Sequence, residues 1–494
     1  MSHLPTDPVR TISRAALVAL ALACLVAVPA LAHEEGEIQW SQFQGGPGHP
    51  GALGEAPEPP YRQAWRFVGP DGPVSGAVIA GDLAVAVGSS AVYGLELSTG
   101  ALEWEVPREG GRISMPAIGL VGEEQLLVFL EGPAGEGGSS DASPTPTTAS
   151  PTPSGSTGGG DDAGSERSSL VAIDLATQQE RWRTELEAPS RSGVTLSGEQ
   201  VFAADDDGTV YAVELGSGAV SWSAPTPGRV EAPLAIADGN VYAVSRDEDA
   251  RTAQLTALDE VTGEEAWAFT PPAAAVAASA VSAADAMAVV GTADRLVRGL
   301  DAETGEVRFE SLALTLFSPV TSPAFQPGNV YAADASGGVY RFDPSDGSRD
   351  WQHQLNDLVV RSSTVLAGPS LLVGTNDGRL VAFDVETGDV VWEGETSQGL
   401  VGAISLSHEV VVAVKGGKEA GLIAFEHDPD GALVKIQSPT IVDPGQLYGN
   451  YALALVVVAI AVYVPFRLLR VRIGPAFEPA ETEGSAEDEG EDAS

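Results

Sequence analysis

The side chains of this chain that could do chemistry are its carboxylates, a few histidines and one cysteine. The 494 residues include 69 Asp and Glu, six His and the single Cys24. Clustered carboxylates can bind Ca²⁺ or act as a general base. Here the acids fall mostly in turn positions, such as Asp205, Asp206, Asp207 and Asp384, where solvated turn caps are the ordinary explanation. We therefore predict no catalytic, cofactor-binding or metal-binding residue.

The histidines do not form a metal-binding pattern either. A leader peptide cut after Ala32 would make His33 the new N-terminus, which can chelate copper through its amine and ring when another histidine is held close by. The remaining histidines of such a mature chain show no ligand spacing: His49, His353, His408 and His427. We expect a solvated terminus at His33.

These residues belong to a repeat that recurs along most of the chain. Each unit has an apolar strand, a turn rich in acids and glycine, and a strand that ends in an aromatic residue. The closing aromatics are Trp104, Trp182, Trp222, Trp267, Phe309, Trp351 and Trp392. From Trp182 onward their spacing is 40 to 45 residues, which fits the four-stranded blade of a β-propeller. Alternation within 380–385 and many β-branched residues indicate strands.

The two ends of the repeat predict how the ring closes. Residues 62–66 look like a final tryptophan strand without the three strands before it. Residues 401–426 supply three strands of a last unit whose fourth strand is doubtful. Joining the strand of Trp65 to the last unit would remove the exposed edges of an open ring. We predict an all-β, eight-bladed β-propeller over residues 62–437, with the tryptophans as core spacers between blades.

The repeat resembles a known family. The pattern A-x-D-x-x-T-G-x-x-x-W at 257–267 and 382–392, and its shorter form at 172–177, look like the tryptophan-docking repeat of pyrroloquinoline quinone (PQQ)-type propellers. Residues 40–52 are similar to the opening segment of such proteins. The resemblance covers roughly residues 40–437. The family includes quinone-dependent dehydrogenases, the lipoprotein of the outer-membrane assembly machinery, and sensory or scaffold ectodomains.

Departures from the enzyme branch favour a non-enzyme. The resemblance to quinoprotein alcohol dehydrogenases would imply an adjacent cysteine pair over the cofactor and a calcium set of Glu, Asn and Asp. With Cys24 alone that pair is impossible. Three units also lack part of the repeat pattern, because Phe309 replaces Trp, Gln178 replaces glycine, and Asp346 replaces threonine; we interpret these changes as structural drift.

The two ends of the chain predict its compartment. Residues 1–32 read as a secretory signal peptide, with Arg10 and Arg14 before an apolar run and a small-residue cleavage site. Lipidation of Cys24 is an alternative to cleavage after Ala32, but the residues before Cys24 form a poor lipobox. Residues 33–61 would form an extracytoplasmic N-terminal segment. Uncharged residues 447–466 are long enough to span a bilayer, and the basic residues after them predict a cytoplasmic tail: Arg467, Arg470 and Arg472.

Three further segments have the composition of connectors. The tether 438–446 reaches at most roughly 30 Å, so the propeller would stay close to the membrane. The acidic tail 467–494 and the Gly/Ser/Thr/Pro-rich loop 132–168 are predicted to be disordered. The loop divides two strands of one blade and is either a tolerated insertion or a glycosylated or partner-contacting flap.

The net charge of −43 restricts the partners. Nucleic acid would be repelled, whereas concentrated salt would screen the acidic surface, as in a halophile. Lysine is nearly absent, which also suits a GC-rich genome. We predict a membrane-anchored, single-pass, non-catalytic scaffold that binds a protein or an envelope polymer and needs no cofactor. The alternative is a PQQ-dependent dehydrogenase with an unusual or degenerate site.

Overall fold

The computed structural model describes residues 37–132, 167–230, 232–247, 252–272, 282–284, 286–292, 296–312, 322–334, 336–355, 362–395 and 401–433. Contacts divide the chain into two units, Met1–Pro439 and Thr440–Ser494. All the described residues belong to the first unit. The predicted signal peptide, tether, membrane helix and tail lie outside them, as do residues 133–166 of the predicted loop. In the described part, no helix is long and apolar enough to cross a membrane.

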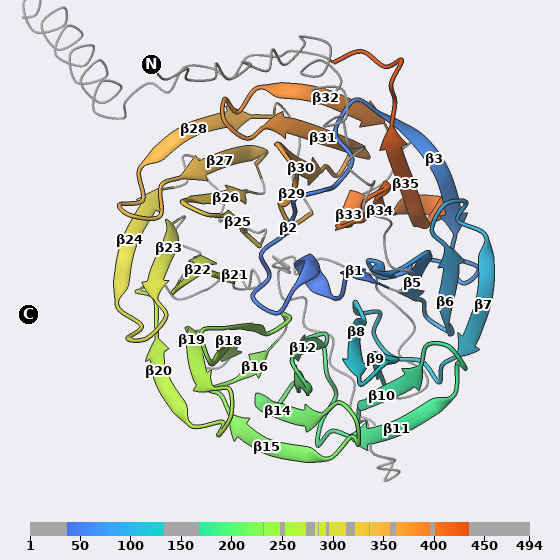
Figure 1. Ribbon diagram of the computed structural model, residues 1–494. Coiled ribbons are helices and arrows are strands. Elements are labelled where there is room, and N and C mark those ends of the chain that lie inside the picture. Colours follow the sequence, from blue (N-terminus) through green and yellow to red (C-terminus); the bar gives the residue numbers. More distant parts are fainter. Residues whose placement is uncertain are drawn as a thin grey trace, which may run out of the picture. The chain divides into compact units, whose positions relative to one another are not determined.

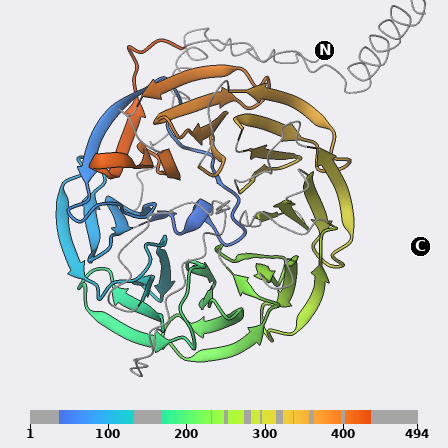
Figure 2. The ribbon, with the colours of Figure 1, turned by 180° about the vertical axis from the view of Figure 1, so that it is seen from behind.

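Eight β-sheets surround a common axis, which confirms the predicted eight-bladed propeller (Figure 1). The same ring is seen from behind in Figure 2. Within each blade the four strands, which we name A to D from the axis outward, pair antiparallel.

The first four blades follow one another along the chain. Blade one holds β4 (Val78–Ala80), β5 (Leu83–Val87), β6 (Ala91–Glu96) and β7 (Leu102–Pro107). Blade two holds β8 (Ala117–Val121), β9 (Glu124–Glu131), β10 (Ser169–Asp174) and β11 (Glu180–Glu185). Blade three holds β12 (Thr195–Ser197), β13 (Gln200–Ala204), β14 (Thr209–Glu214) and β15 (Val220–Pro225). Blade four holds β17 (Ala235–Ala237), β18 (Asn240–Asp247), β19 (Thr252–Asp259) and β20 (Glu265–Phe269), with β16 (Arg229–Val230) added to β18.

The other four blades continue along the chain in the same way, except that blade eight combines strands from both ends of the ring. Blade five holds β21 (Ser282–Ala284), β22 (Met287–Gly291), β23 (Leu296–Asp301) and β24 (Val307–Leu312). Blade six holds β25 (Ala324–Gln326), β26 (Asn329–Ala333), β27 (Gly338–Phe342) and β28 (Arg349–Gln354). Blade seven holds β29 (Val365–Ala367), β30 (Ser370–Gly374), β31 (Arg379–Asp384) and β32 (Val390–Glu395). Blade eight joins β33 (Val401–Leu406), β34 (Val410–Lys415) and β35 (Gly421–His427) to β3 (Tyr61–Val68), and a 3-10 helix η2 (Gly417–Glu419) precedes β35.

The strand of Trp65 therefore completes blade eight, as predicted. β3 pairs with β35 from Tyr61 opposite His427 to Val68 opposite Gly421. The indole nitrogen of Trp65 then donates to the carbonyl of Leu97 in blade one, at 2.6 Å. This bond lies across the seam between the last blade and the first, so both sheet edges at the seam are covered.

One backbone feature aims the closing aromatic of every blade at its neighbour. In each blade the C–D pairing skips the residue just before the aromatic; in blade three, Ala212 faces Trp222 and Val213 faces Val220. Such a bulge re-aims the side chain that follows it. The facing residue is alanine in five blades and glycine in two, and at Gly94 a Cβ would lie 2.1 Å from the Trp104 ring.

The aromatics dock on the C–D turn of the next blade, which confirms their prediction as core spacers. Indole N–H groups donate to turn carbonyls in five interfaces: Trp65 to Leu97, Trp182 to Leu215, Trp222 to Glu260, Trp267 to Ala302 and Trp351 to Val385. The turn glycine lies against the ring, and a Cβ on Gly218 would come within 2.7 Å of Trp182. Where the repeat departs from its pattern the geometry persists: Phe309 packs against Gly347, and Gln178 takes the left-handed φ of 56°.

Candidate functional site

The axis of the ring is occupied by the N-terminal part of the described chain, residues 37–54, which we call the axial segment. It contains β1 (Ile38–Trp40), the 3-10 helix η1 (Phe43–Gly45) and β2 (Ala52–Leu53). In Figure 1 this blue segment runs across the middle of the ring. β1 extends the sheet of blade one by pairing with β4, and β2 pairs parallel with β29 of blade seven.

Between those two strands the axial segment hydrogen-bonds the A strands of six successive blades. Strand A of a blade has an inner edge whose N–H groups would otherwise face the axis without partners. In each case the second residue of the A strand donates its N–H to an oxygen of the segment. The pairs are Ile118 with Ser41 O (2.7 Å), Leu196 with Gln42 Oε1 (2.5 Å), Ile236 with Pro47 O (2.7 Å), Ala283 with Gly48 O (2.7 Å), Phe325 with Pro50 O (2.8 Å) and Leu366 with Gly51 O (2.6 Å).

Two glutamine side chains complete this set of bonds. The amide of Gln42 also donates to the carbonyl of Leu196 at 3.0 Å, so it contacts that residue as a backbone peptide unit would. The amide of Gln44 donates to the carbonyl of Thr364 at 2.9 Å. Both glutamines are almost fully buried. A buried amide without partners is costly, by about 1–3 kcal/mol, so these bonds help to fix the path of the segment.

Blade eight holds both ends of the segment. Gln39 accepts the backbone N–H of His408 through its side-chain oxygen at 2.9 Å. The His408 ring Nδ1 lies 3.0 Å from the carbonyl of Glu55, just beyond the segment. Trp40 is fully buried in the apolar cluster that joins the segment to blades one, two, seven and eight. All eight blades therefore contact one short stretch of chain.

The structure does not bring the histidines together. His49 is buried in the axial segment, edge-on to Phe43 at 5.0 Å. His353 lies edge-on to Phe383 in the interface of blades six and seven, where burial lowers its pKa. Within the described ranges, no group of three or more His, Cys, Asp or Glu side chains is placed to hold a metal ion. His33 lies outside the described residues.

The axial residues do not fit PQQ, the quinone cofactor that the resemblance to the enzymes of the family would imply. A flat anionic cofactor on the axis would need open space and cationic partners. The axial segment contains neither Lys nor Arg. Its two glutamine amides are bonded to blade carbonyls, and Trp40 and His49 are fully buried. The residues in this part of the axis therefore do not form a binding site for PQQ.

The turn carboxylates act as caps, with one correction. Asp384 accepts the N–H and hydroxyl of Thr387 at 2.8 and 3.0 Å, as expected for a turn cap. Asp205, by contrast, is fully buried rather than solvated. Its carboxylate accepts the N–H of Thr209 at 2.8 Å and the hydroxyl of Tyr211 at 2.7 Å. Burial and this hydrogen bond raise the pKa of Tyr211 to about 12. The apolar surroundings of a B–C turn were not evident from its acidic sequence.

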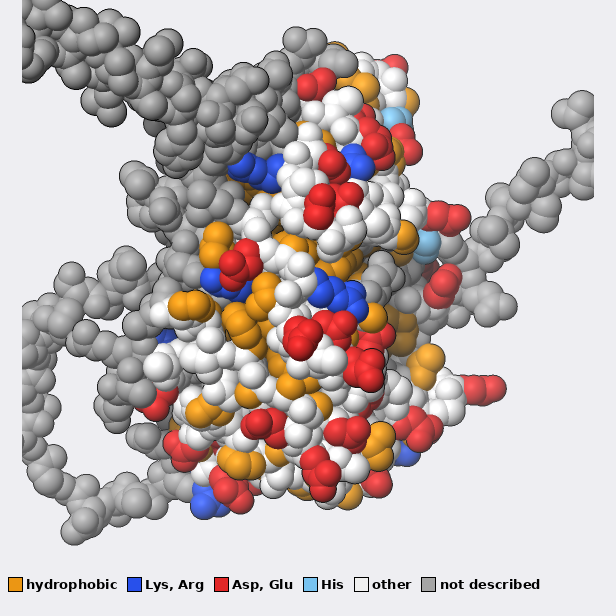
Figure 3. Space-filling view, turned by 90° about the vertical axis from the view of Figure 1, so that its left-hand side faces the viewer, with side chains coloured by type: hydrophobic (Ala, Val, Ile, Leu, Met, Phe, Trp, Pro, Cys, Tyr) orange, Lys and Arg blue, Asp and Glu red, His pale blue; other side chains and the backbone are white. Residues whose placement is uncertain are grey.

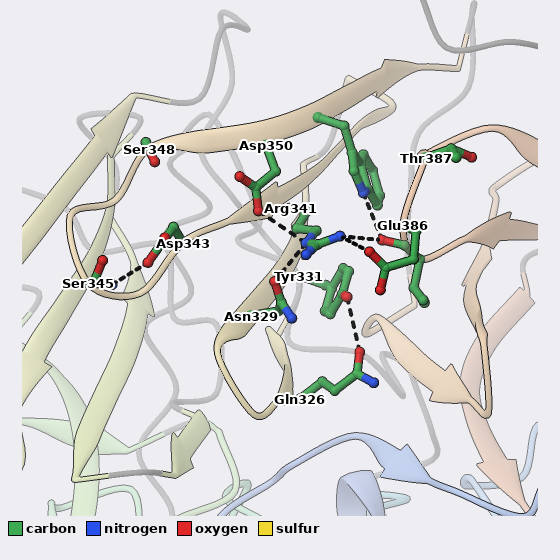
Figure 4. Close-up of polar contacts among 12 residues, drawn as sticks. Gln326, Asn329, Tyr331, Arg341, Asp343, Ser345, Ser348, Asp350, Glu386 and Thr387 are labelled. Carbon is green, nitrogen blue, oxygen red and sulfur yellow. Dashed lines mark hydrogen bonds and ion pairs between the residues drawn. The ribbon is translucent and has the colours of Figure 1, made fainter.

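Blade six has a polar interface with blade seven, which Figure 4 shows. Arg341 occupies the position opposite the closing Trp351, where most other blades have alanine or glycine. Its guanidinium donates to Asn329 Oδ1 at 2.7 Å, and it reaches the carbonyl of Val385 at 3.1 Å and Glu386 Oε2 at 3.0 Å in blade seven (Figure 4). Asp350 lies 3.1 Å from the same guanidinium. Arg341 therefore joins two blades through a network that the repeat pattern did not predict.

The outer wall of the ring has a mixed surface. On the side shown in Figure 3, carboxylates are spread among apolar and basic side chains. On the outer D strands, Val220 is 48 % exposed and Leu102 is 46 % exposed. Exposed pairs such as Arg62 with Glu426, at 2.8 Å, contribute little to stability. Scattered apolar residues of this kind are normal on a protein surface and mark no site by themselves.

Comparison with known proteins identifies related propellers. The sequence pattern of the family described as "Outer membrane protein assembly factor BamB" matches residues 166–268 and 249–428. The assembly factor BamB of Yersinia pestis is 24 % identical over 303 residues, which cover 56 % of this chain and 73 % of that protein. The quinohemoprotein alcohol dehydrogenase ADH IIB of Pseudomonas putida is 28 % identical, but over 119 residues that cover 21 % of this chain and 17 % of the enzyme.

A solved structure supports the same fold. The crystal structure of BamB from Moraxella catarrhalis superposes with a TM-score of 0.53 at 18 % sequence identity. The superposition covers 74 % of this chain and 99 % of that structure. At this identity the likeness concerns the propeller fold alone.

Proposed function

Because this chain belongs to the family of the outer membrane protein assembly factor BamB, we propose that it is a non-catalytic scaffold of the cell envelope. In this proposal the propeller stands outside the cytoplasmic membrane and holds a protein partner. Residues 1–32 act as its leader and 447–466 anchor it by one helix. The partner is a protein of envelope assembly, in keeping with the relatives, which are outer membrane protein assembly factors. An envelope polymer is a second kind of partner for the same surface.

The observation that carries the proposal is the filled axis. Enzymes need a concave site with convergent polar groups. Here the axial segment bonds to the A strands of six blades and commits its glutamine amides to Leu196 and Thr364. Polar side chains elsewhere in the described ring also form bonds within the fold: Asp384 caps a turn, and Arg341 donates to the next blade. Such a ring presents rigid faces of turns, which suit a binding role.

Cross-linking in intact cells tests the scaffold role. Photoreactive residues are placed one at a time at exposed turn positions around the ring, for example at Val261 on the C–D turn of blade four. At least one of these positions should trap one recurrent envelope protein, whereas the same residue at buried Ala257 should trap none. Failure at a panel of exposed turn positions around the ring would contradict a protein-binding role. The anchoring is tested separately, because protease added to spheroplasts should cut the loop 132–168 and spare the tail 467–494.

The alternative of a quinone-dependent dehydrogenase has its own test. Titration of the purified propeller with PQQ and Ca²⁺ should give neither saturable binding nor dye reduction with alcohols or sugars. Stoichiometric binding with substrate-dependent dye reduction would make the enzyme interpretation the correct one. This measurement needs no partner, so it is independent of the cross-linking result.

A further inference from the structure

The axial segment is inserted into the ring from one end and is not threaded through it. At its start, Glu37 O accepts the N–H of Gly81 at 2.7 Å, and at its end Leu53 O accepts the N–H of Gly368 at 3.1 Å. Gly81 and Gly368 both lie in turns that join strand A to strand B, in blades one and seven. The two ends of the segment therefore lie at the same end of the ring, so its withdrawal would not require the ring to open.

We propose that the inner wall of the ring is a binding site for an extended, glycine-rich peptide, which the axial segment fills in cis. The same site would take such a segment of a partner protein when the axial segment withdraws. This inference rests on the proposed scaffold function and deepens it, because it names where a partner binds and what part of the partner is recognised.

The recognition is largely of backbone, as in strand addition to a sheet edge. Five of the six A-strand N–H groups donate to main-chain carbonyls of the segment: those of Ser41, Pro47, Gly48, Pro50 and Gly51. The sixth donates to the side chain of Gln42. A site that reads main-chain carbonyls can accept another extended chain with the same spacing of acceptors. The six donors, one from each of six blades, provide that spacing on the wall.

Glycine is required where the segment meets the wall. A Cβ on Gly48 would lie 2.3 Å from the carbonyl oxygen of Ala283, which is too close for any side chain. Gly51 has a φ of +61°, and its Cβ would lie 3.0 Å from the carbonyl oxygen of Thr364. Blade backbone cannot move aside as a flexible side chain could. The site therefore selects a peptide with glycines three residues apart.

The blades do not depend on the segment for most of their packing. The apolar clusters that join blades two to six are built from blade residues, for example Val201 and Tyr211 between blades two and three. The segment contributes Trp40 and Phe43 to the remaining cluster, which lies at blades one, two, seven and eight. Release of the segment would therefore open the one cluster that contains Trp40 and Phe43 and leave the other four clusters in place.

The test is to cut the full-length ectodomain and exchange the segment. A protease recognition sequence is inserted after Gly54, which is exposed and whose Cβ direction is open. After folding and cleavage, the fragment ending at residue 54 should remain with the ring on gel filtration. A fluorescent synthetic peptide of residues 37–54 should then replace it saturably at one per ring, while tryptophan fluorescence and circular dichroism report a folded propeller. The matched peptide with Gly48→Val should bind at least tenfold more weakly.

Three results would overturn the proposal: no exchange from a ring that stays folded, unfolding of the ring when the fragment leaves, or equal binding of the Gly48→Val peptide. If the insertion prevents folding, hydrogen exchange on the uncut protein decides instead. The amides of the six A strands should exchange together and faster than B-strand amides such as that of Ala203, and exchange only with global unfolding would contradict release. The six A-strand amides to follow are those of Ile118, Leu196, Ile236, Ala283, Phe325 and Leu366. These readouts use no partner protein, so their failure is distinguishable from a failure of the scaffold role.

Discussion

Arg341 and Trp351 lie opposite each other in blade six and donate to the same oxygen, the carbonyl of Val385 in blade seven, at 3.1 and 2.9 Å. A carbonyl oxygen has two lone pairs and can accept both bonds. The docking tryptophan therefore shares its acceptor with a cation that also binds Glu386 at 3.0 Å. This interface combines the repeat's indole contact with a charge-assisted bond.

We expect Arg341→Met to destabilise the propeller by about 1–3 kcal/mol, because it removes charge-assisted hydrogen bonds from a mostly buried guanidinium. The matched control is Arg62→Met, which removes an exposed ion pair with Glu426 and should change stability by less than about 1 kcal/mol. Chemical denaturation of the purified ectodomain measures both. Equal effects of the two substitutions would show that the blade-six network adds nothing special.

Substitutions of Trp65 should report on the seam of the ring. Trp65→Phe loses the 2.6 Å bond to the carbonyl of Leu97 and should cost about 1 kcal/mol. Trp65→Ala also leaves a cavity and should cost about 3–5 kcal/mol. Trp267→Phe is the control within the continuous part of the chain, where the bond to Ala302 is 2.9 Å. A seam as strong as the other interfaces predicts similar losses for the two phenylalanine variants; no loss at Trp65 would argue against closure there.

Lowering the pH should remove the stabilisation that the ionised Asp301 carboxylate gives to its turn. A side-chain hydrogen bond from Arg308, with further bonds from Thr304, lowers the pKa of Asp301 to about 2. A carboxylate with a lowered folded-state pKa stabilises the fold above its unfolded pKa of about 4. That contribution is lost as the pH falls through the folded-state value. The melting temperature of Asp301→Asn should thus fall less than that of the wild type between about pH 5 and pH 2.

The control for this turn is its exposed neighbour, Glu303→Gln, which changes charge equally without removing the Arg308 bond. Its melting curve should keep the acid-dependent loss of the wild type. Identical pH profiles for Asp301→Asn and the wild type would contradict the role given to this carboxylate.

Salt should stabilise the ring because the chain carries a net charge of −43. Repulsion among the acids is least screened below about 0.1 M salt, where the Debye length exceeds about 10 Å. We expect the melting temperature to rise from low to molar NaCl, and to rise similarly with KCl. A melting temperature that is indifferent to salt over this range would mean that the acidic surface is not an adaptation to concentrated salt.

The sequence by itself determined the blades and the way the ring closes. Each unit is built from hydrogen bonds between strands close in the chain, so apolar runs, turn glycines and closing tryptophans reveal it locally. The same local patterns show that the strand of Trp65 lacks the three strands of a unit and that the last unit lacks its fourth strand. The sequence therefore also predicted that these two parts form one blade. Even units that lack part of the pattern kept their geometry, because Phe309 still meets Gly347 and Gln178 accepts a positive φ.

Only the tertiary structure decided what fills the axis and which polar residues join blades. Gln42 meets Leu196 across 154 residues, and Gln44 meets Thr364 across 320. Neither contact leaves a local period, so residues 40–52 could be recognised as a family-like opening segment but not as an axial ligand. Arg341 likewise breaks the small-residue pattern opposite the docking aromatic, and two of its acceptors, Val385 and Glu386, lie in the next blade. Contacts of this kind depend on the ring being closed, because closure alone brings eight inner edges around one short segment.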